Sequence, residues 1–148
     1  MSVTMKSVDL GRLKITPGKK VMAQLGASFL VDSRRRIEAG IGSSGKAMRA
    51  YTPAYAKIRA KAGRVVDHRT LVFSDRMLSA RGVKATTDTS VTIGWGPGEE
   101  SLKALGNEAR TPFVAPTSAE RKALIARVKS LVKSKIAADL AAARATKK

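Results

Sequence analysis

Basic side chains are the residues of this sequence whose number and spacing indicate a chemistry, namely the binding of a polyanion. The 148 residues include 29 lysines and arginines against 11 acidic residues, a formal net charge of +18. Segment 33–64 holds nine basic residues and one acid, 117–148 holds nine and two, and 65–116 is balanced at six each. Because like charges at this density repel one another, we expect the two basic segments to face a nucleic acid or an acidic partner.

Residues for catalysis or metal binding are scarce. The chain has no cysteine and one histidine, which excludes thiolate nucleophiles, disulfides and multi-histidine metal sites. His68 follows Asp67, but neighbours in an extended chain point apart, so we expect no catalytic triad. Gly18-Lys19-Lys20 lacks the leading glycine of a phosphate-binding loop and has lysine where such loops have Ser or Thr. The acids are scattered, so we predict no enzyme, no cofactor and no metal.

Two helices are predicted in the first half of the chain. Thr16-Pro17 has the composition of a helix start, and apolar residues follow at helical spacing from Val21 to Ile37. The glycines of 40–45 end that helix. Thr52-Pro53 is a second possible start, and Gly63 marks its end. Short β-prone runs follow at 65–66 and 71–73, and Ser74 is placed to cap a brief helix.

The second half of the chain predicts a hairpin and a long C-terminal helix. Apolar and polar residues alternate in 83–87 and 91–95 around an Asp88-Thr89 turn, which is typical of a β-hairpin. A short helix over 99–105 and an extended segment over 110–116 follow. Thr117 and Glu120 form a capping box, and an apolar stripe continues to Leu140. We therefore predict an α+β fold with long N- and C-terminal helices packed on a small antiparallel sheet.

The length fits one domain. We divide the chain into an N-terminal arm over 1–16, a single α+β domain over 17–140 and a frayed basic tail over 141–148. No apolar run approaches the roughly 18 to 20 residues of a membrane-spanning helix, so we predict no membrane contact and synthesis in the cytoplasm.

The order of several short motifs resembles the phage virion morphogenesis, or tail-completion, family, whose members lie at the head–tail junction of tailed phages. The resemblance spans Val21 to Ile136. It rests on the amphipathic helix Val21–Ile37, the Thr-x-x-x-x-Lys segment 52–57 and the Val-Thr-Ile-Gly strand 91–94. Residues 73–80 stand in the place of the family's Thr-Gly-x-Leu-x-x-Ser motif, and 110–116 in the place of its Arg-x-Phe-x-x-Pro ending. Ser74-Asp75 replaces the usual Thr-Gly, and 105–108 lacks the family's histidine. Tail completion, tail termination and head closure therefore all stay open.

The resemblance implies a structural virion protein that forms a homo-oligomeric ring of about six copies around the DNA channel. Its partners would be other copies of itself, further neck, connector and tail-tube proteins, and packaged double-stranded DNA in non-specific contact. In this picture the surface toward the DNA channel or an acidic partner comprises Arg34, Arg35, Arg36, Lys57, Arg59, Lys61 and Arg64. The residues expected to pack subunits are Leu78, Trp95 and Phe113.

One alternative class stays open on the composition alone. A small basic protein of ribosomal or nucleoid type would bind nucleic acid without sequence preference and without assembling into a ring. The two hypotheses differ in self-assembly, which separates them experimentally.

Overall fold

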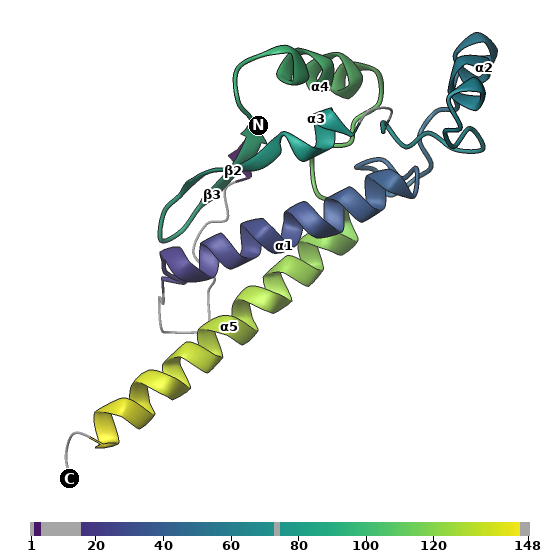
Figure 1. Ribbon diagram of the computed structural model, residues 1–148. Coiled ribbons are helices and arrows are strands. Elements are labelled where there is room, and N and C mark those ends of the chain that lie inside the picture. The colour runs from purple at the N-terminus through teal and green to yellow at the C-terminus, as the bar shows by residue number, and fades with distance from the viewer. Residues whose placement is uncertain (1, 4–15, 73–74, 146–148) are drawn as a thin grey trace.

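Two long helices and a small antiparallel sheet form the α+β fold that the sequence predicts. The computed structural model describes residues 2–3, 16–72 and 75–145. Along the chain the elements are β1 (Ser2–Val3), α1 (Lys19–Glu38), α2 (Pro53–Lys61), α3 (Arg76–Ser79), β2 (Arg81–Thr86), β3 (Val91–Trp95), α4 (Glu99–Arg110) and α5 (Ser118–Ala145). Figure 1 shows α1 and α5 running alongside one another in opposite directions, with α2 set apart from both.

The main core lies where α1, α5 and the sheet meet. Leu25 and Phe29 of α1, Val128 of α5 and Ile93 of β3 are all at most 2% exposed. Gly26 allows this close approach, because a Cβ there would lie 2.7 Å from Val91 Cγ2. The apolar stripes that predicted the two long helices are thus the faces that they bury against each other.

The hairpin forms where it was predicted, between β2 and β3, with a bulge between Val83 and Ala85. The strand order is β1-β3-β2, so the first described residues add a short outer strand from within the predicted arm. The rest of the arm, 4–15, lies outside the described residues.

The start of α1 differs from the prediction at Thr16-Pro17. The N-cap is Gly18, whose φ of +87° favours glycine, and the helix begins at Lys19. The hairpin turn satisfies these backbone donors: Gly18 N donates to Asp88 O at 3.1 Å and Lys19 N to Asp88 Oδ1 at 2.9 Å. The capping group therefore comes from a turn far along the chain rather than from the preceding threonine.

A second, smaller core holds the loops and short helices together. Ile37, Met77 and Phe113 are buried in it, with Leu71 and Val72 packed against its edge. The β-prone runs 65–66 and 71–72 form no strand, because none of the described strands lies beside them to supply partners. Phe73 and Ser74, expected to continue that run and to cap the next helix, lie outside the described residues, and Asp75 is the N-cap of α3.

Other helix boundaries follow their local signals. Thr52 Oγ1 accepts from Tyr55 N at the start of α2, as expected. The capping box of α5 is confirmed, since Thr117 N donates to Glu120 Oε2 at 2.7 Å and Glu120 N to Thr117 Oγ1 at 3.1 Å. The α4 helix runs to Arg110, five residues past its predicted end. The α5 helix runs to Ala145, into the predicted tail 141–148.

Candidate nucleic-acid interface

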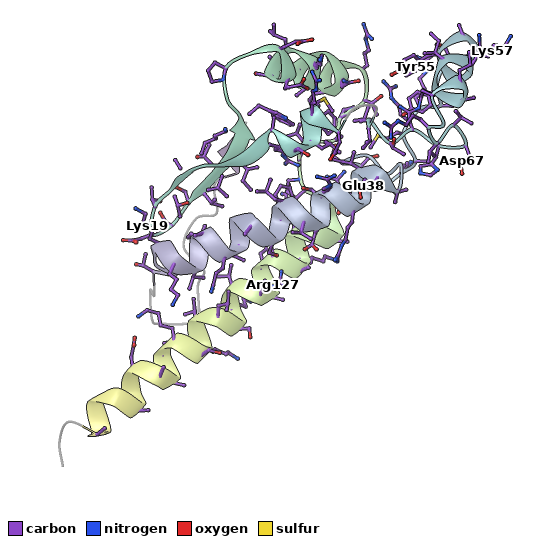
Figure 2. The ribbon with its side chains drawn as sticks, viewed as in Figure 1. Lys19, Glu38, Tyr55, Lys57, Asp67 and Arg127 are labelled. Carbon is purple, nitrogen blue, oxygen red and sulfur yellow. The ribbon has the colours of Figure 1, made fainter. Side chains whose placement is uncertain are left out.

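Four of the seven basic residues predicted to face DNA are exposed. Arg35 lies on the outer side of α1, and Lys57, Lys61 and Arg64 lie on α2 and just after it. Figure 2 shows Lys57 on the outer side of α2, away from the long helices. These four side chains are accessible to a large partner.

A second set of exposed cations lies on α5. Lys122, Lys129 and Lys133 are seven and four residues apart, which places them on one side of the helix, and all three are exposed. None of them forms an ion pair with a described carboxylate. A row of lysines at this spacing can contact successive anionic groups along an extended polymer.

Arg34 is half-buried, and its charge is compensated. It donates to Glu38 Oε1 at 2.8 Å and to both oxygens of Asp75 at 2.8 Å. The hydrogen bond to Asp75 and that to Glu38 raise the pKa of Arg34, and the hydrogen bond from Arg34 lowers the pKa of Asp75. Arg34 therefore joins α1 to the start of α3 and offers little free charge to a polyanion.

Arg36 does not face a polyanion, which corrects the prediction. Its side chain is 8% exposed and donates to Glu120 Oε1 at 2.8 Å. It also donates to the carbonyls of Ile41, Phe113 and Ala115 at 3.1, 2.9 and 3.2 Å. Arg36 thus fastens the end of α1 to the beginning of α5.

Arg59 is also internal, contrary to the prediction. It is 2% exposed, and its guanidinium donates to the carbonyls of Val65 and Val72 at 2.9 and 2.8 Å. Its charge lies 4.5 Å from the centroid of the Tyr51 ring, a cation–π contact. Arg59 closes the loop that follows α2 onto that helix.

The three residues predicted to pack subunits lie within the chain's own structure. Leu78 and Phe113 are 6% and 0% exposed, so neither surface is available to another subunit. Trp95 is partly buried: its Nε1 donates to Met77 O at 2.6 Å, and its ring meets Phe113 at 70°. They hold β3 against the small core.

Two kinds of residue escaped the sequence reasoning. Arg81, at the start of β2, is 8% exposed and donates to Ser33 Oγ at 2.9 Å and to Val114 O at 3.2 Å. Desolvation, and secondarily the charge of Arg36, lowers its pKa to about 10, so it stays protonated near neutral pH. On the outside, Leu102 and Leu105 of α4 are 70% and 65% exposed. Their spacing of three within a helix was a usable signal for a common face.

The histidine is arranged differently from the prediction. His68 Nδ1 lies 2.8 Å from Asp67 Oδ1, so the two side chains meet instead of pointing apart. The other ring nitrogen, Nε2, lies 3.0 Å from the Glu38 carbonyl, which leaves it turned to backbone rather than to a hydroxyl nucleophile. Within the described ranges no cluster of three His, Asp or Glu side chains could hold a metal ion. Of the helices that the structure describes, none has the length and apolar composition of a membrane span.

No protein-family model, curated protein or solved structure matches this chain. What can be said of its function rests on the exposed cations, on the exposed apolar side chains and on the motif resemblance.

Proposed function

We propose that the protein is a structural virion protein of the head–tail junction of a tailed phage, acting in tail completion, tail termination or the neck. In this proposal about six copies form a homo-oligomeric ring around the DNA channel and join tail to head. The observation that carries the proposal is the set of exposed cations Lys57, Lys61 and Arg64, with Lys122, Lys129 and Lys133 of α5, which form no ion pair with a described carboxylate.

The electrostatic support lies in how the exposed cations are distributed. Lys57, Lys61 and Arg64 lie on α2 and just after it, whereas Lys122, Lys129 and Lys133 lie on α5, a helix that Figure 1 shows apart from α2. Such an arrangement suits a large anionic surface that is read by charge and not by sequence. A protein through which DNA of any sequence passes needs that kind of contact.

The exposed leucines of α4 support the self-assembly in the proposal. Large exposed apolar side chains that lie together on a surface are a common feature of protein–protein contacts. In the ring, Leu102 and Leu105 would contact the next copy, in place of the buried Leu78 and Phe113.

The row of lysines on α5 favours the alternative, a monomeric or dimeric basic protein that binds nucleic acid without sequence preference. A single helix that presents Lys122, Lys129 and Lys133 along one side can track a phosphate backbone by itself. That protein would need no ring.

The deciding experiment is negative-stain electron microscopy of the purified protein, combined with solution mass at low and high salt, with and without duplex DNA. The proposal expects closed rings whose central hole admits a duplex. The double substitution Leu102→Ser/Leu105→Ser should reduce the fraction in rings without changing helix content. Tight duplex binding by a species that stays monomeric under all conditions would favour the alternative.

The DNA interaction is tested separately by the salt dependence of duplex binding. Neutralising Lys57, Lys61 and Arg64 with glutamine should reduce the slope of log K against log salt by roughly 3, because each phosphate that a cation neutralises adds close to one unit to that slope. The matched control removes the same charge elsewhere: glutamine replaces Lys19 and Lys20 at the start of α1 and Lys84 in the hairpin. An equal reduction in both variants would refute the assignment of this surface.

A further inference from the structure

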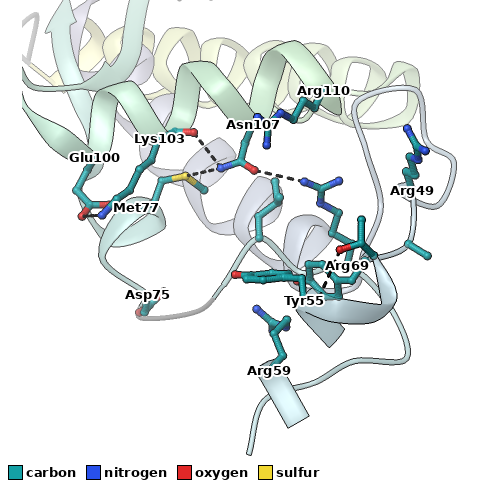
Figure 3. A pocket seen from close by; sticks show the side chains of 14 residues that line it. Arg49, Tyr55, Arg59, Arg69, Asp75, Met77, Glu100, Lys103, Asn107 and Arg110 are labelled. Atoms are coloured by element: carbon teal, nitrogen blue, oxygen red, sulfur yellow. Dashed lines mark hydrogen bonds and ion pairs between the residues drawn. The ribbon is translucent and has the colours of Figure 1, made fainter. Parts of the chain in front are cut away.

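A pocket of about 740 Å³ opens between α2 and α4, and of the residues predicted to face DNA only Arg59 lines it. Figure 3 shows it from close by: Tyr55 and Arg59 of α2 lie on one side, and Lys103, Asn107 and Arg110 of α4 on the other. Its volume is within the range of about 300–1,000 Å³ that is usual for ligand sites.

Three arginines from different parts of the chain line this pocket. Arg49 precedes α2, Arg69 lies in the loop after it, and Arg110 ends α4. In the view of Figure 3 they lie toward one side, opposite Asp75 and Glu100. None of the three forms an ion pair with a described carboxylate.

The acids of the pocket cannot compensate these arginines, because each is already paired. Asp75 Oδ2 lies 2.8 Å from the guanidinium of Arg34. Glu100 Oε1 lies 3.1 Å from Lys103 Nζ, which also contacts Glu99 at 2.8 Å. The charge of Arg49, Arg69 and Arg110 on their side of the pocket therefore stays positive.

Arg69 is held in place by hydrogen bonds to neutral groups. Its NH1 donates to Thr111 Oγ1 at 3.2 Å and its NH2 to Asn107 Oδ1 at 3.4 Å. Asn107 is oriented in turn by donating to Lys103 O at 2.9 Å. These bonds fix the guanidinium beside α4 but leave its charge uncompensated, and burial of part of the side chain strengthens its attraction to an anion.

We propose that this pocket binds carboxylates of an acidic peptide segment of a partner protein. The planar fork of each guanidinium matches the two oxygens of a carboxylate, which gives short, charge-assisted hydrogen bonds. Because the arginines come from three separate segments, they can contact side chains spaced along an extended chain. This binding goes beyond the proposed ring and DNA interaction and does not depend on either.

The geometry disfavours nucleic acid in this pocket. A duplex presents its phosphates on a wide convex surface, which meets projecting side chains better than a recess of this size. Single strands are held by bases stacked on open aromatic faces. Here the guanidinium of Arg59 lies 4.5 Å from the Tyr51 ring centroid, and the Tyr55 ring meets Tyr51 edge-on at 5.3 Å. The Tyr51 ring is thus used within the protein, which leaves Tyr55, 39% exposed, as the one ring of the described lining that a base could reach.

The test is fluorescence anisotropy of the full chain with a labelled peptide of alternating glutamate and glycine, beside its glutamine counterpart and a single-stranded oligothymidine. We expect the acidic peptide alone to bind in the pocket. Arg49→Gln/Arg110→Gln should weaken it at least about tenfold, since each charge-assisted hydrogen bond to the peptide is worth that factor or more. The matched control Lys129→Gln/Lys133→Gln removes the same charge from α5 and should change affinity less than about twofold.

A charge-preserving variant separates paired hydrogen bonds from a guanidinium to a carboxylate from non-specific electrostatic attraction. Arg49→Lys/Arg110→Lys keeps the charge and should still lose part of the affinity, because lysine cannot bind a carboxylate with two parallel bonds. Circular dichroism checks that each variant is folded, and Arg49 and Arg110 have no hydrogen-bond partner among the described residues whose loss would unfold the chain. The proposal is overturned by absence of peptide binding, by equal loss of affinity in the α5 control, or by oligothymidine binding that the pocket variant abolishes.

Discussion

Replacing Arg36 by methionine should destabilise the protein far more than the same change at its neighbour Arg35. The two substitutions remove the same charge and leave side chains of similar length. Arg35 is exposed, whereas the side chains of Arg36 and its partner Glu120 are 8% and 15% exposed. The pair of variants therefore separates the effect of burial from the effect of net charge.

The magnitude follows from what Arg36→Met leaves behind. The Glu120 carboxylate loses a 2.8 Å ion pair, and the carbonyls of Ile41, Phe113 and Ala115 lose their donor. Breaking a buried pair from one side costs about 3–5 kcal/mol. Glu120 still accepts from Thr117 N, so we expect the lower end, about 3 kcal/mol. That is a large part of a domain stability of roughly 5–15 kcal/mol.

Urea unfolding followed by circular dichroism and by the fluorescence of the single tryptophan measures both variants. Arg35→Met should stay within about 0.5 kcal/mol of the parent protein, as exposed substitutions do. If Arg36→Met differed from Arg35→Met by less than about 1 kcal/mol, the reasoning from burial would be refuted, because a truly buried pair costs several times that.

Three further variants test other parts of the structure. Gly26→Ala places a Cβ 2.7 Å from the hairpin and should destabilise by about 1–3 kcal/mol in urea unfolding, whereas Gly106→Ala in open space should stabilise by up to about 1 kcal/mol; the reverse order would contradict the packing. The hydrogen bond from Arg34 lowers the pKa of Asp75, so its stabilisation is present above the unfolded pKa of about 4 and lost as pH falls through the folded value. Asp75→Asn should thus lower the free energy of unfolding near neutral pH, by less than about 1 kcal/mol for so exposed a pair, and leave it unchanged in strong acid. An equal drop in Tm at both pH values would exclude the ion pair. Thr117→Ala should cost about 1 kcal/mol, and an unchanged urea midpoint would show that the capping box contributes nothing.

The features that the sequence predicted correctly are those set by neighbouring residues. The capping box of Thr117 and Glu120 and the threonine cap of α2 each need only three or four residues in a row. The hairpin needs only alternation on either side of a turn. Local chemistry is enough to specify these elements, whatever the rest of the chain does.

The basic surface was predicted less well, because burial of an arginine depends on distant segments. Arg36 is buried by carbonyls of 113 and 115, which lie 77 and 79 positions further along the chain. Arg59 is buried by the loop that folds back after α2. Charge alone cannot distinguish an arginine that binds backbone carbonyls from one that faces solvent. The sequence signal that comes nearest to marking a buried arginine is a position beside the apolar stripe, as for Arg36 next to Ile37.

The length of α5 has a consequence for how the helix forms. Among the side chains that the structure describes, Ile136 is the last of α5 packed against the main core, and the nine residues from 137 to 145 follow it, at the yellow end of the helix in Figure 1. A separate peptide of that length would not become helical in water, because the first turn is costly to nucleate. Here the packed turns serve as the nucleus, and the alanine-rich end only propagates from them. Warming should therefore shorten the helix residue by residue from Ala145 inward, with a falling circular dichroism signal, while the tryptophan fluorescence stays constant until the core unfolds.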